Sequence, residues 1–239
     1  MILKGKRVIV TGGSGYLGRE LVSALTAAGA EVGVFDLNSD QPGAIAVDLT
    51  DPRQVESAVA NFAANGKPID VLVNNAGIIF SAPLVKFHEG KFEKHDFGDW
   101  DRVLRTNLSS AFYVTACAAE IMLSRRTPGV IINVCSISSK GNAGQSAYSA
   151  AKAGLTALTT TWAKELGPLG VRCAGISPGF MDTPSTRKAL SEKTLADIQK
   201  RVPLRRLGTT ADFAAAVMSI IGNDYFNGKI LELDGGLTL

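Results

Sequence analysis

The segment Arg7-Val-Ile-Val-Thr-Gly-Gly-Ser-Gly-Tyr-Leu-Gly18 joins a short apolar run to a turn with four glycines. The run Val8–Val10 predicts a buried strand, and the pattern over residues 15–28 predicts a helix directly after the turn. Three of the glycines satisfy G-x-G-x-x-G, at Gly13, Gly15 and Gly18. Glycines in this pattern permit a tight turn and let the backbone approach a pyrophosphate at the start of the helix. A glycine turn without a ligand is the alternative, but its place between the first strand and the first helix favours dinucleotide binding.

Apolar strand-like runs and helical patterns alternate along the rest of the chain. The predicted strands are Val8–Val10, Val32–Phe35, Ile69–Val73, Val130–Val134, Val171–Ile176 and Ile230–Leu233. Helices are predicted over 15–28, 52–64, 97–126, 147–166 and 209–221, with a shorter one over 188–201. This order predicts an α/β fold over residues 1–239: a single-domain, Rossmann-type, doubly wound parallel sheet of about seven strands with helices on both faces. Irregular segments follow strands at 78–98 and 179–208, and we expect both to form substrate loops, the second as a lid.

The composition limits the classes of partner. The net charge of the 239 residues is only +3, which does not indicate nucleic acid. No run of about 20 apolar residues predicts a membrane span, and the first residues do not resemble a signal peptide. Three scattered cysteines favour a reducing, cytoplasmic setting. His88 and His95 lie in a charged loop that fixes no ligand geometry, so we expect no metal site.

The segment Ser146-Ala-Tyr-Ser-Ala-Ala-Lys-Ala-Gly154 carries a candidate acid and base. Tyr148 and Lys152 are four residues apart on the predicted helix, and such residues share one face. A free tyrosine, with a pKa near 10, is a poor base at neutral pH, and we expect the Lys152 ammonium to lower the pKa of the Tyr148 phenol. The phenol could then give or take a proton near the working pH. For this pair alone, a tyrosine packed against a lysine stem in an ordinary helix is the more common arrangement.

Asp36 ends the second predicted strand, at the distance from the glycine turn where an acidic residue meets a ribose 2′-hydroxyl. A carboxylate there repels a 2′-phosphate, and the following Leu37-Asn38-Ser39 offers no arginine to offset it. We therefore predict NAD(H) rather than NADP(H). An aspartate used as a turn residue is the alternative, since Asn38 and Ser39 also favour turns.

Together with these residues, five further motifs resemble the short-chain dehydrogenase/reductase family along essentially the whole chain. The motifs are Asn74-Asn-Ala-Gly77, Asn107 within Thr-Asn-Leu, Ser136 after Ile-Asn-Val-Cys, Tyr148-x-x-x-Lys152, and Pro178-Gly179 followed by Thr183. The resemblance is to the compact single-domain branch. It implies hydride transfer between NAD(H) and a small-molecule secondary alcohol or ketone. It also implies a homo-oligomer, a tetramer or a dimer.

The resemblance also implies a role for each motif residue. Tyr148 is expected to be the general acid/base, and Lys152 is expected to lower the pKa of Tyr148 and to hold the nicotinamide ribose. Ser136 is expected to polarise the substrate carbonyl. Asn107 is expected to hold a water molecule of a proton relay. The implied cofactor-binding residues are Gly12, Ser14, Gly15, Tyr16, Leu17, Asp36, Asp48, Leu49, Asn75, Ala76, Gly77, Tyr148, Lys152, Pro178, Gly179 and Thr183. Ser138 and Ser139 are nearby rivals of Ser136.

Two departures from the compact branch accompany the likeness. Tyr16 stands where that branch usually has glycine. The turn looks instead like that of the longer branch, which contains sugar-nucleotide epimerases. Members of the longer branch carry a C-terminal substrate domain, for which we expect no room in this chain. The segment from Gly77 to Trp100 looks longer than usual. Two other functions stay open. A 3-oxoacyl thioester reductase, usually NADPH-linked, is disfavoured by Asp36, and a non-catalytic NAD(H) sensor is disfavoured by the intact catalytic residues.

Overall fold

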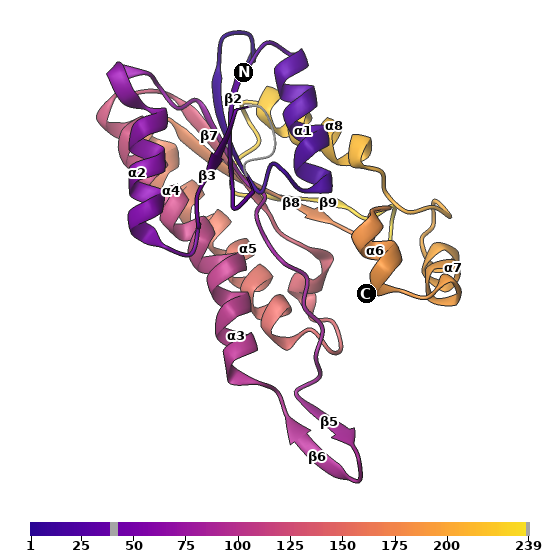
Figure 1. Cartoon of the computed structure of the whole chain (residues 1–239). Helices are drawn as coiled ribbons and strands as arrows, with labels where there is room; N and C mark the ends of the chain where they lie inside the picture. Colours follow the sequence, from indigo (N-terminus) through magenta and orange to yellow (C-terminus); the bar gives the residue numbers. More distant parts are fainter. Residues whose placement is uncertain (39–42, 238–239) are drawn as a thin grey trace.

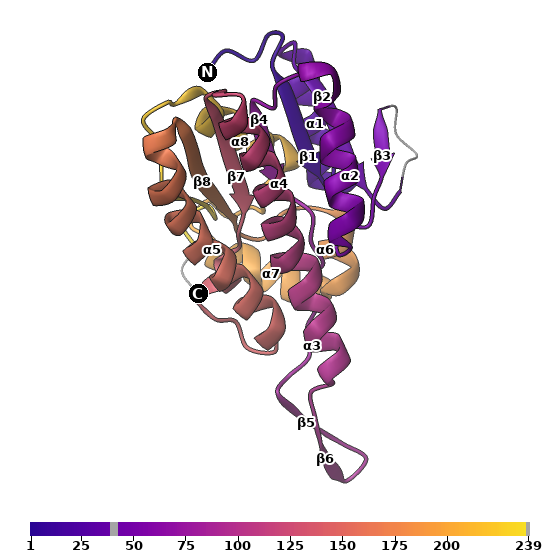
Figure 2. The ribbon, with the colours of Figure 1, turned by 90° about the vertical axis from the view of Figure 1, so that its left-hand side faces the viewer.

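A parallel sheet of seven strands forms the middle layer of the protein (Figure 1 and Figure 2). The computed structural model describes residues 1–38 and 43–237. In spatial order the strands are β3 (Ala44–Ala46), β2 (Glu31–Asp36), β1 (Arg7–Thr11), β4 (Val71–Asn74), β7 (Gly129–Val134), β8 (Val171–Pro178) and β9 (Ile230–Leu233). The predicted doubly wound sheet is confirmed. Six of its strands match predicted apolar runs, and β3 is the strand of this sheet that was not predicted. The strand order reverses between β1 and β4, and ligands of such sheets bind in the crevice at the carboxyl ends of the strands there.

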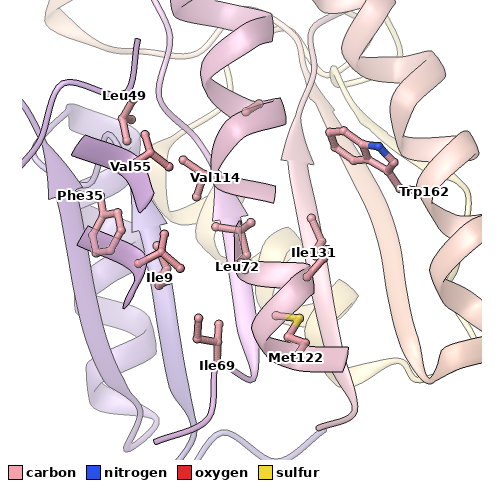
Figure 3. Close-up of a cluster of buried hydrophobic side chains, with 14 of the residues drawn as sticks. Ile9, Phe35, Leu49, Val55, Ile69, Leu72, Val114, Met122, Ile131 and Trp162 are labelled. Atoms are coloured by element: carbon pink, nitrogen blue, oxygen red, sulfur yellow. The ribbon is translucent and has the colours of Figure 1, made fainter. Parts of the chain in front are cut away.

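Helices cover both faces of the sheet. They are α2 (Pro52–Phe62), α4 (Ser110–Ser124) and α5 (Ser146–Leu166) on one face, and α1 (Tyr16–Ala27) and α8 (Thr210–Gly222) on the other. Alternate residues of β1 serve the two faces: Ile9 packs in the cluster shown in Figure 3, while Val8 and Val10 pack against α1 and α8. Because both faces are covered, the central strands are mostly apolar, which is why apolar runs predicted them correctly.

Two predicted helices differ in the structure. The helix predicted over 97–126 comprises α3 (Phe97–Leu104), one turn of π-helix, η2 (Arg105–Ser109), and then α4. The prediction of one helix over 188–201 is wrong, because α6 (Pro184–Ala189) and α7 (Glu192–Arg201) are separate. Leu190 is extended between them, and Ser191 begins α7 by accepting a hydrogen bond from a backbone N–H of its first turn.

The segment 78–98, which was predicted to be irregular, contains a β-hairpin that projects away from the sheet (Figure 1 and Figure 2). Its strands, β5 (Val85–His88) and β6 (Lys91–Lys94), pair in antiparallel register. Glu89 and Gly90 between them have φ values of 50° and 83°, as a two-residue type I′ turn requires. The overlooked signal was local: apolar and polar residues alternate on both sides of Glu-Gly.

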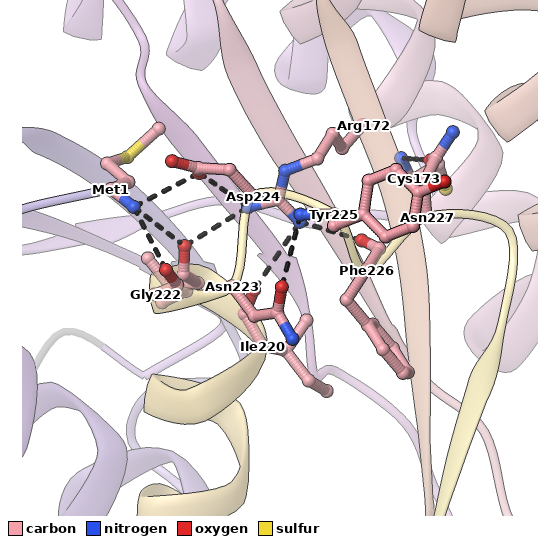
Figure 4. Close-up of polar contacts among 11 residues, drawn as sticks. Met1, Arg172, Cys173, Ile220, Gly222, Asn223, Asp224, Tyr225, Phe226 and Asn227 are labelled. Atoms are coloured by element: carbon pink, nitrogen blue, oxygen red, sulfur yellow. Dashed lines mark hydrogen bonds and ion pairs between the residues drawn. The ribbon is translucent and has the colours of Figure 1, made fainter.

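The carboxyl end of α8 is held by two cationic groups from distant parts of the chain (Figure 4). The amino group of Met1 donates to the Gly222 carbonyl oxygen at 3.3 Å and to the Asp224 carboxylate at 3.1 Å. Arg172, on β8, donates to the carbonyl oxygen of Ile221 at 3.1 Å, and to that of Phe226, just after the helix, at 2.8 Å. Positive charge is favourable at the carboxyl end of a helix, and these contacts tie α8 to the sheet.

Candidate active site

The predicted glycine turn lies at the carboxyl end of β1 and leads into α1. Gly12 has a φ of +63°, and a Cβ atom there would lie 2.7 Å from the Cα atom of Ala76. A side chain at Gly18 would overlap the carbonyl oxygen of Gly12. Gly15 is the N-cap of α1 and has no side chain to cap the first N–H groups of the helix. The turn therefore offers an anion both space and the positive end of a helix dipole.

Asp36 faces this turn from the end of β2. Its carboxylate accepts hydrogen bonds from the backbone N–H groups of Ser14 at 3.0 Å and Asn38 at 3.3 Å. The Ser14 hydroxyl donates to the carbonyl oxygen of Asn38 at 3.2 Å, so the glycine turn is hydrogen-bonded to the segment that ends β2. Ser39, the last residue of the Leu37-Asn38-Ser39 stretch on which the cofactor prediction also depends, lies outside the described residues.

Asp48 and Leu49, predicted beside the adenine, lie just before α2. The Asp48 carboxylate accepts hydrogen bonds from the backbone N–H of Thr50 at 2.9 Å and from its hydroxyl at 2.7 Å. Leu49 is buried in the same cluster as Phe35. This end of the site is thus shaped by a fixed loop with an apolar floor.

The segment Asn74–Gly77 links the glycine turn to the long helix of α3 and α4. The Asn75 side chain donates to the carbonyl oxygen of Gly12 at 2.9 Å. Asn107, within the π-helical turn, donates its side-chain amide to the carbonyl oxygen of Ile78 at 3.1 Å and accepts from the Ile78 N–H at 3.1 Å. Single π-helical turns often occur at functional sites, and this one places a buried amide against the end of β4.

Ser136, Tyr148 and Lys152 meet where β7 ends and α5 begins, and all three are buried. A hydrogen bond joins Ser136 to Tyr148. The Lys152 Nζ atom lies 5.8 Å from the centre of the Tyr148 ring and donates to the carbonyl oxygen of Val134 at 2.7 Å. A hydroxyl, a phenol and an amine are therefore grouped at one strand end and one helix start.

Burial changes the ionisation of Tyr148 and Lys152. It raises the pKa of the Tyr148 phenol, and the hydrogen bond with Ser136 opposes this rise. It lowers the pKa of Lys152 to about 8. The prediction that Lys152 lowers the pKa of Tyr148 is wrong for this structure, because burial disfavours the charged form of both groups. At neutral pH the phenol is therefore protonated, which is the form that can donate a proton.

A cavity of about 1090 Å³ runs along the carboxyl ends of the strands and joins these groups. All the predicted site residues line it: Gly12, Ser14, Gly15, Tyr16, Leu17, Asp36, Asp48, Leu49, Asn75, Ala76, Gly77, Asn107, Ser136, Tyr148, Lys152, Pro178, Gly179 and Thr183. Its volume is slightly above the roughly 300–1,000 Å³ that is typical of ligand pockets. The residues present fit a dinucleotide, because the glycine turn can hold phosphates and the Asp36 carboxylate can accept a ribose hydroxyl.

An apolar wall of the cavity was missed by the sequence prediction. Its residues are Ile78, Ile79, Ile137, Phe180, Met181 and Leu190. Three of them directly follow a predicted site residue at a strand end, as Ile78 follows Gly77. That position was an available signal, because the residues after strand ends form the crevice of such sheets.

The segment predicted as a substrate lid contributes to the cavity through α6. Thr183 is the N-cap of α6 and accepts a hydrogen bond from the Thr186 N–H at 3.2 Å, and both residues line the cavity. Leu195 and Ile198 of α7 pack in one buried cluster with Ile137, next to Ser136. The two helices therefore lie directly against the candidate site.

The described residues offer no second kind of centre. Within residues 1–38 and 43–237, no group of three or more His, Cys, Asp or Glu side chains is arranged to hold a metal ion. Cys135 lines the cavity, but burial raises the pKa of its thiol. In the same described ranges, every helix is too short or too polar to cross a membrane.

Comparisons with known proteins identify the family. A family model described as enoyl-(acyl carrier protein) reductase matches residues 14–238. The 3-oxoacyl-[acyl-carrier-protein] reductase FabG of Thermotoga maritima is 34% identical in an alignment of 256 positions that covers 100% of both chains. The chain belongs to the short-chain dehydrogenase/reductase family. The resemblance inferred from the motifs is therefore confirmed.

Other short-chain dehydrogenase/reductase relatives agree with this result. The protein of the same name from Chlamydia pneumoniae is 36% identical, over 99% of this chain and 98% of the relative. The crystal structure of a candidate gluconate dehydrogenase from Agrobacterium tumefaciens superposes with a TM-score of 0.87 at 31% identity, over 99% of this chain and 98% of that one. As a member of this family, the protein is an oxidoreductase that acts on a CH–OH group or a ketone with a nicotinamide cofactor.

The unusual residue of the glycine turn, Tyr16, is compatible with this family site. Its side chain is 53% exposed at the first position of α1, and it lines the cavity. The turn itself is shaped by Gly12 and Gly18, which have no room for side chains. The departure at residue 16 therefore changes the lining of the cavity and leaves the turn intact.

Proposed function

We propose that this short-chain dehydrogenase/reductase uses NAD(H) to interconvert a small secondary alcohol and a ketone. The observation that supports this most strongly is that Ser136, Tyr148 and Lys152 share one cavity with the glycine turn and Asp36. A bound nicotinamide would supply or accept the hydride. The chain itself has to orient the substrate and move one proton.

Tyr148 moves the proton in this proposal. Its phenol oxygen donates a proton to the carbonyl oxygen of a ketone and takes it back from the hydroxyl in the reverse direction. The Ser136 Oγ atom accepts a hydrogen bond from the Ser138 N–H at 3.1 Å, which fixes the hydroxyl beside Tyr148, where it can orient the substrate oxygen. Lys152, whose pKa is about 8, can return a proton to the phenolate that remains after donation, because this value suits proton transfer near neutral pH. Asn107 fixes the long helix against Ile78, in the segment that follows β4, beside this group.

The position of Asp36 supports NAD(H) over NADP(H). Its carboxylate lies on the glycine turn, bound to the Ser14 N–H, and lines the cavity. A ribose 2′-hydroxyl can donate to this carboxylate, whereas a 2′-phosphate would meet a like charge. Leu37 and Asn38, which also line this end of the cavity, supply no positive charge.

A 3-oxoacyl thioester is the second candidate substrate. Relatives with full-length similarity are named for 3-oxoacyl-[acyl-carrier-protein] reduction. The apolar wall that includes Ile78, Phe180 and Leu190 suits an acyl chain. Such a substrate also contains a ketone, so the same serine, tyrosine and lysine would reduce it.

The test is a panel of ketones, secondary alcohols and an acetoacetyl thioester. The turnover of each compound is measured by the absorbance of the reduced nicotinamide, once with NAD(H) and once with NADP(H). We expect turnover with NADH and weaker turnover with NADPH. A thioester reduced far faster than simple ketones would favour the second candidate. A clear preference for NADPH would contradict the role given to Asp36.

The substitution Tyr148→Phe separates an enzyme from a non-catalytic NAD(H) sensor. Phenylalanine has no proton to transfer, so kcat should fall by about 10²–10⁴-fold while the affinity for NADH changes little. Steady-state rates and NADH fluorescence titration measure the two effects. A variant with wild-type turnover would remove Tyr148 from the mechanism. Tight NADH binding by a wild-type protein that turns over no substrate in the panel would favour the sensor.

A further inference from the structure

One glutamine side chain joins three segments that meet at the candidate active site. Gln145 is the N-cap residue of α5, three positions before Tyr148. Its amide oxygen accepts hydrogen bonds from the Ser138 hydroxyl at 2.9 Å and from the Asn142 side-chain amide at 3.0 Å. Its amide nitrogen donates to the Ser81 hydroxyl at 3.1 Å. Both ends of the amide are therefore used to connect different parts of the chain.

Ser138 connects this amide to Ser136. It lies in the short 3₁₀-helix η3 (Ile137–Lys140), two residues after Ser136, and is buried. Its backbone N–H donates to the Ser136 Oγ atom at 3.1 Å, while its own hydroxyl donates to Gln145. Removing the Gln145 amide would therefore release the turn that fixes the Ser136 hydroxyl.

Ser81 connects the same amide to a second segment that lines the cavity. It lies on the segment between β4 and β5 and lines the cavity. The next residue, Ala82, forms an isolated parallel bridge with Gln145. Among the described residues, Gln145 itself is not part of the cavity lining, so it can act on the reaction only through its neighbours.

We infer that Gln145 is a positioning residue that holds Ser136 in register with Tyr148 and fixes the wall at Ser81 to the same point. Its bond to Ser138 ties the turn that carries Ser136 to the helix that carries Tyr148. A displacement of about 1 Å in a catalytic group can cost about 10²-fold in rate, so a side chain that only sets this spacing matters for turnover. This role rests on the proposed function of Ser136 and Tyr148.

Gln145→Met tests the role, because methionine has a similar length and makes none of the three hydrogen bonds. We expect kcat to fall by about 10- to 100-fold, with little change in NADH affinity or thermal midpoint. Asn142→Ala is the matched control, since it removes one bond to the same oxygen and leaves the Ser138–Gln145–Ser81 connection intact. It should keep kcat near the wild-type value. An unchanged kcat in Gln145→Met would overturn the inference.

A double mutant shows whether Gln145 acts through Ser138. Ser138→Ala removes the other partner of the same hydrogen bond. The double variant with Gln145→Met should lose no more turnover than the worse single variant, because both changes break one connection. Losses in kcat that multiply would show that Gln145 does not act through Ser138.

A titration of Tyr148 tests the same role without any turnover. The hydrogen bond with Ser136 lowers the pKa of the Tyr148 phenol, so Gln145→Met should move its ionisation to higher pH, while Asn142→Ala should not. The ultraviolet absorbance of tyrosinate, minus that of the matching Tyr148→Phe protein, isolates this group. An unchanged titration overturns the inference, whatever the activity. A shifted titration in a protein whose wild type has no turnover would instead contradict the proposed function and leave the positioning role standing.

Discussion

At the scale of single residues, the site keeps polar groups where water cannot reach them. Lys152 is the clearest case, because its side chain is only 3% exposed and its amine donates to the carbonyl oxygen of Val134. Burial lowers the pKa of this amine to about 8. Perturbed ionisable groups of this kind concentrate at functional sites, where they commonly reduce stability.

The substitution Lys152→Met should expose this cost as a stability that depends on pH. Below about pH 8 the native protein holds a buried ammonium, so the variant should be the more stable of the two. Between about pH 8 and the ordinary lysine pKa of 10.5, the native amine loses its proton while the unfolded chain keeps it, so the wild type gains stability. The advantage of the variant should therefore shrink as the pH rises through this window.

Urea unfolding of both proteins at about pH 7 and about pH 10 measures this difference. The lost hydrogen bond to Val134 changes the free energy of unfolding by a similar amount at both pH values, so it cancels from the trend. A difference that stays constant with pH would show that Lys152 is not a buried amine of lowered pKa.

His95 offers a second stability test away from the proposed chemistry. It is buried at the base of the hairpin, and neither ring nitrogen has a hydrogen-bond partner among the described residues. Its ring lies edge-on to Phe80, with centroids 6.0 Å apart. Because each unpartnered buried polar group costs about 1–3 kcal/mol, His95→Phe should raise the free energy of unfolding by about 1 kcal/mol. Urea denaturation at neutral pH measures it, and a destabilised variant would show that the imidazole is satisfied in solution.

At the scale of elements, the hairpin of β5 and β6 stands apart from the rest of the fold. One of its faces carries Val85, Phe87 and Phe92, which are 50%, 66% and 78% exposed. Lys86 and Glu93 form an ion pair of 3.0 Å on the other face. Neither strand contributes a residue to the described lining of the cavity. Isolated two-stranded hairpins are at best marginally stable, so this one adds little to the stability of the chain as described.

Replacing residues 85–94 by a short glycine–serine linker should therefore leave the thermal midpoint within a few degrees of wild type. The His95 N–H donates to the Leu84 carbonyl oxygen at 2.8 Å, so the two ends of the deletion are already adjacent. NADH affinity should also be preserved, because the cavity is unchanged. Thermal unfolding and fluorescence titration measure both quantities. A large drop in the thermal midpoint would mean that the apolar face of the hairpin is covered in solution.

The elements that could be predicted from the sequence are those whose pattern reflects their own burial. Strands such as β7, buried along their whole length, have almost continuously apolar sequences, interrupted in β7 by Asn133, and their predicted and observed bounds differ by a residue or two. The short strand β3 has no such pattern, because it is only partly buried and exists by pairing with β2. The break at Leu190 carries no glycine or proline, and the only local signal was Ser191, a residue type that often begins a helix.

The same distinction holds within the candidate site. Motif residues were placed in one cavity because their chemistry restricts the residue types that can serve, as at Gly12 and Tyr148. The apolar wall depends on packing between distant segments, which the sequence does not display. The direction of the Tyr148 pKa was missed for a related reason: the phenol packs with Val103 and Ala147, and this burial outweighs the effect expected from Lys152.

At the scale of the whole molecule, the cavity crosses the point where the strand order reverses. The glycine turn and Asp36 line it from the β1–β2 side, while Ser136, Tyr148 and Thr183 line it from the β7–β8 side. A ligand that contacts both sides can bind only when the whole sheet is formed. Ligand binding and the folding of the chain should therefore be linked.

The strongest expression of this linkage is a rise in thermal midpoint that depends on which nicotinamide nucleotide is added. At a concentration of NADH about 100 times its Kd, linkage contributes about 2.7 kcal/mol, and for a chain of this size about 1 kcal/mol raises the midpoint by roughly 2–4 °C. NADPH at the same concentration should give a smaller rise because of Asp36.

Asp36→Asn keeps an oxygen to accept from the Ser14 N–H and removes the charge, so it should weaken the NADH effect and strengthen the NADPH effect. Tyr148→Phe is the control and should keep the NADH effect, since it removes a proton donor rather than a nucleotide contact on the glycine turn. Equal shifts with both nucleotides in the wild type would mean that the Asp36 carboxylate does not select between them.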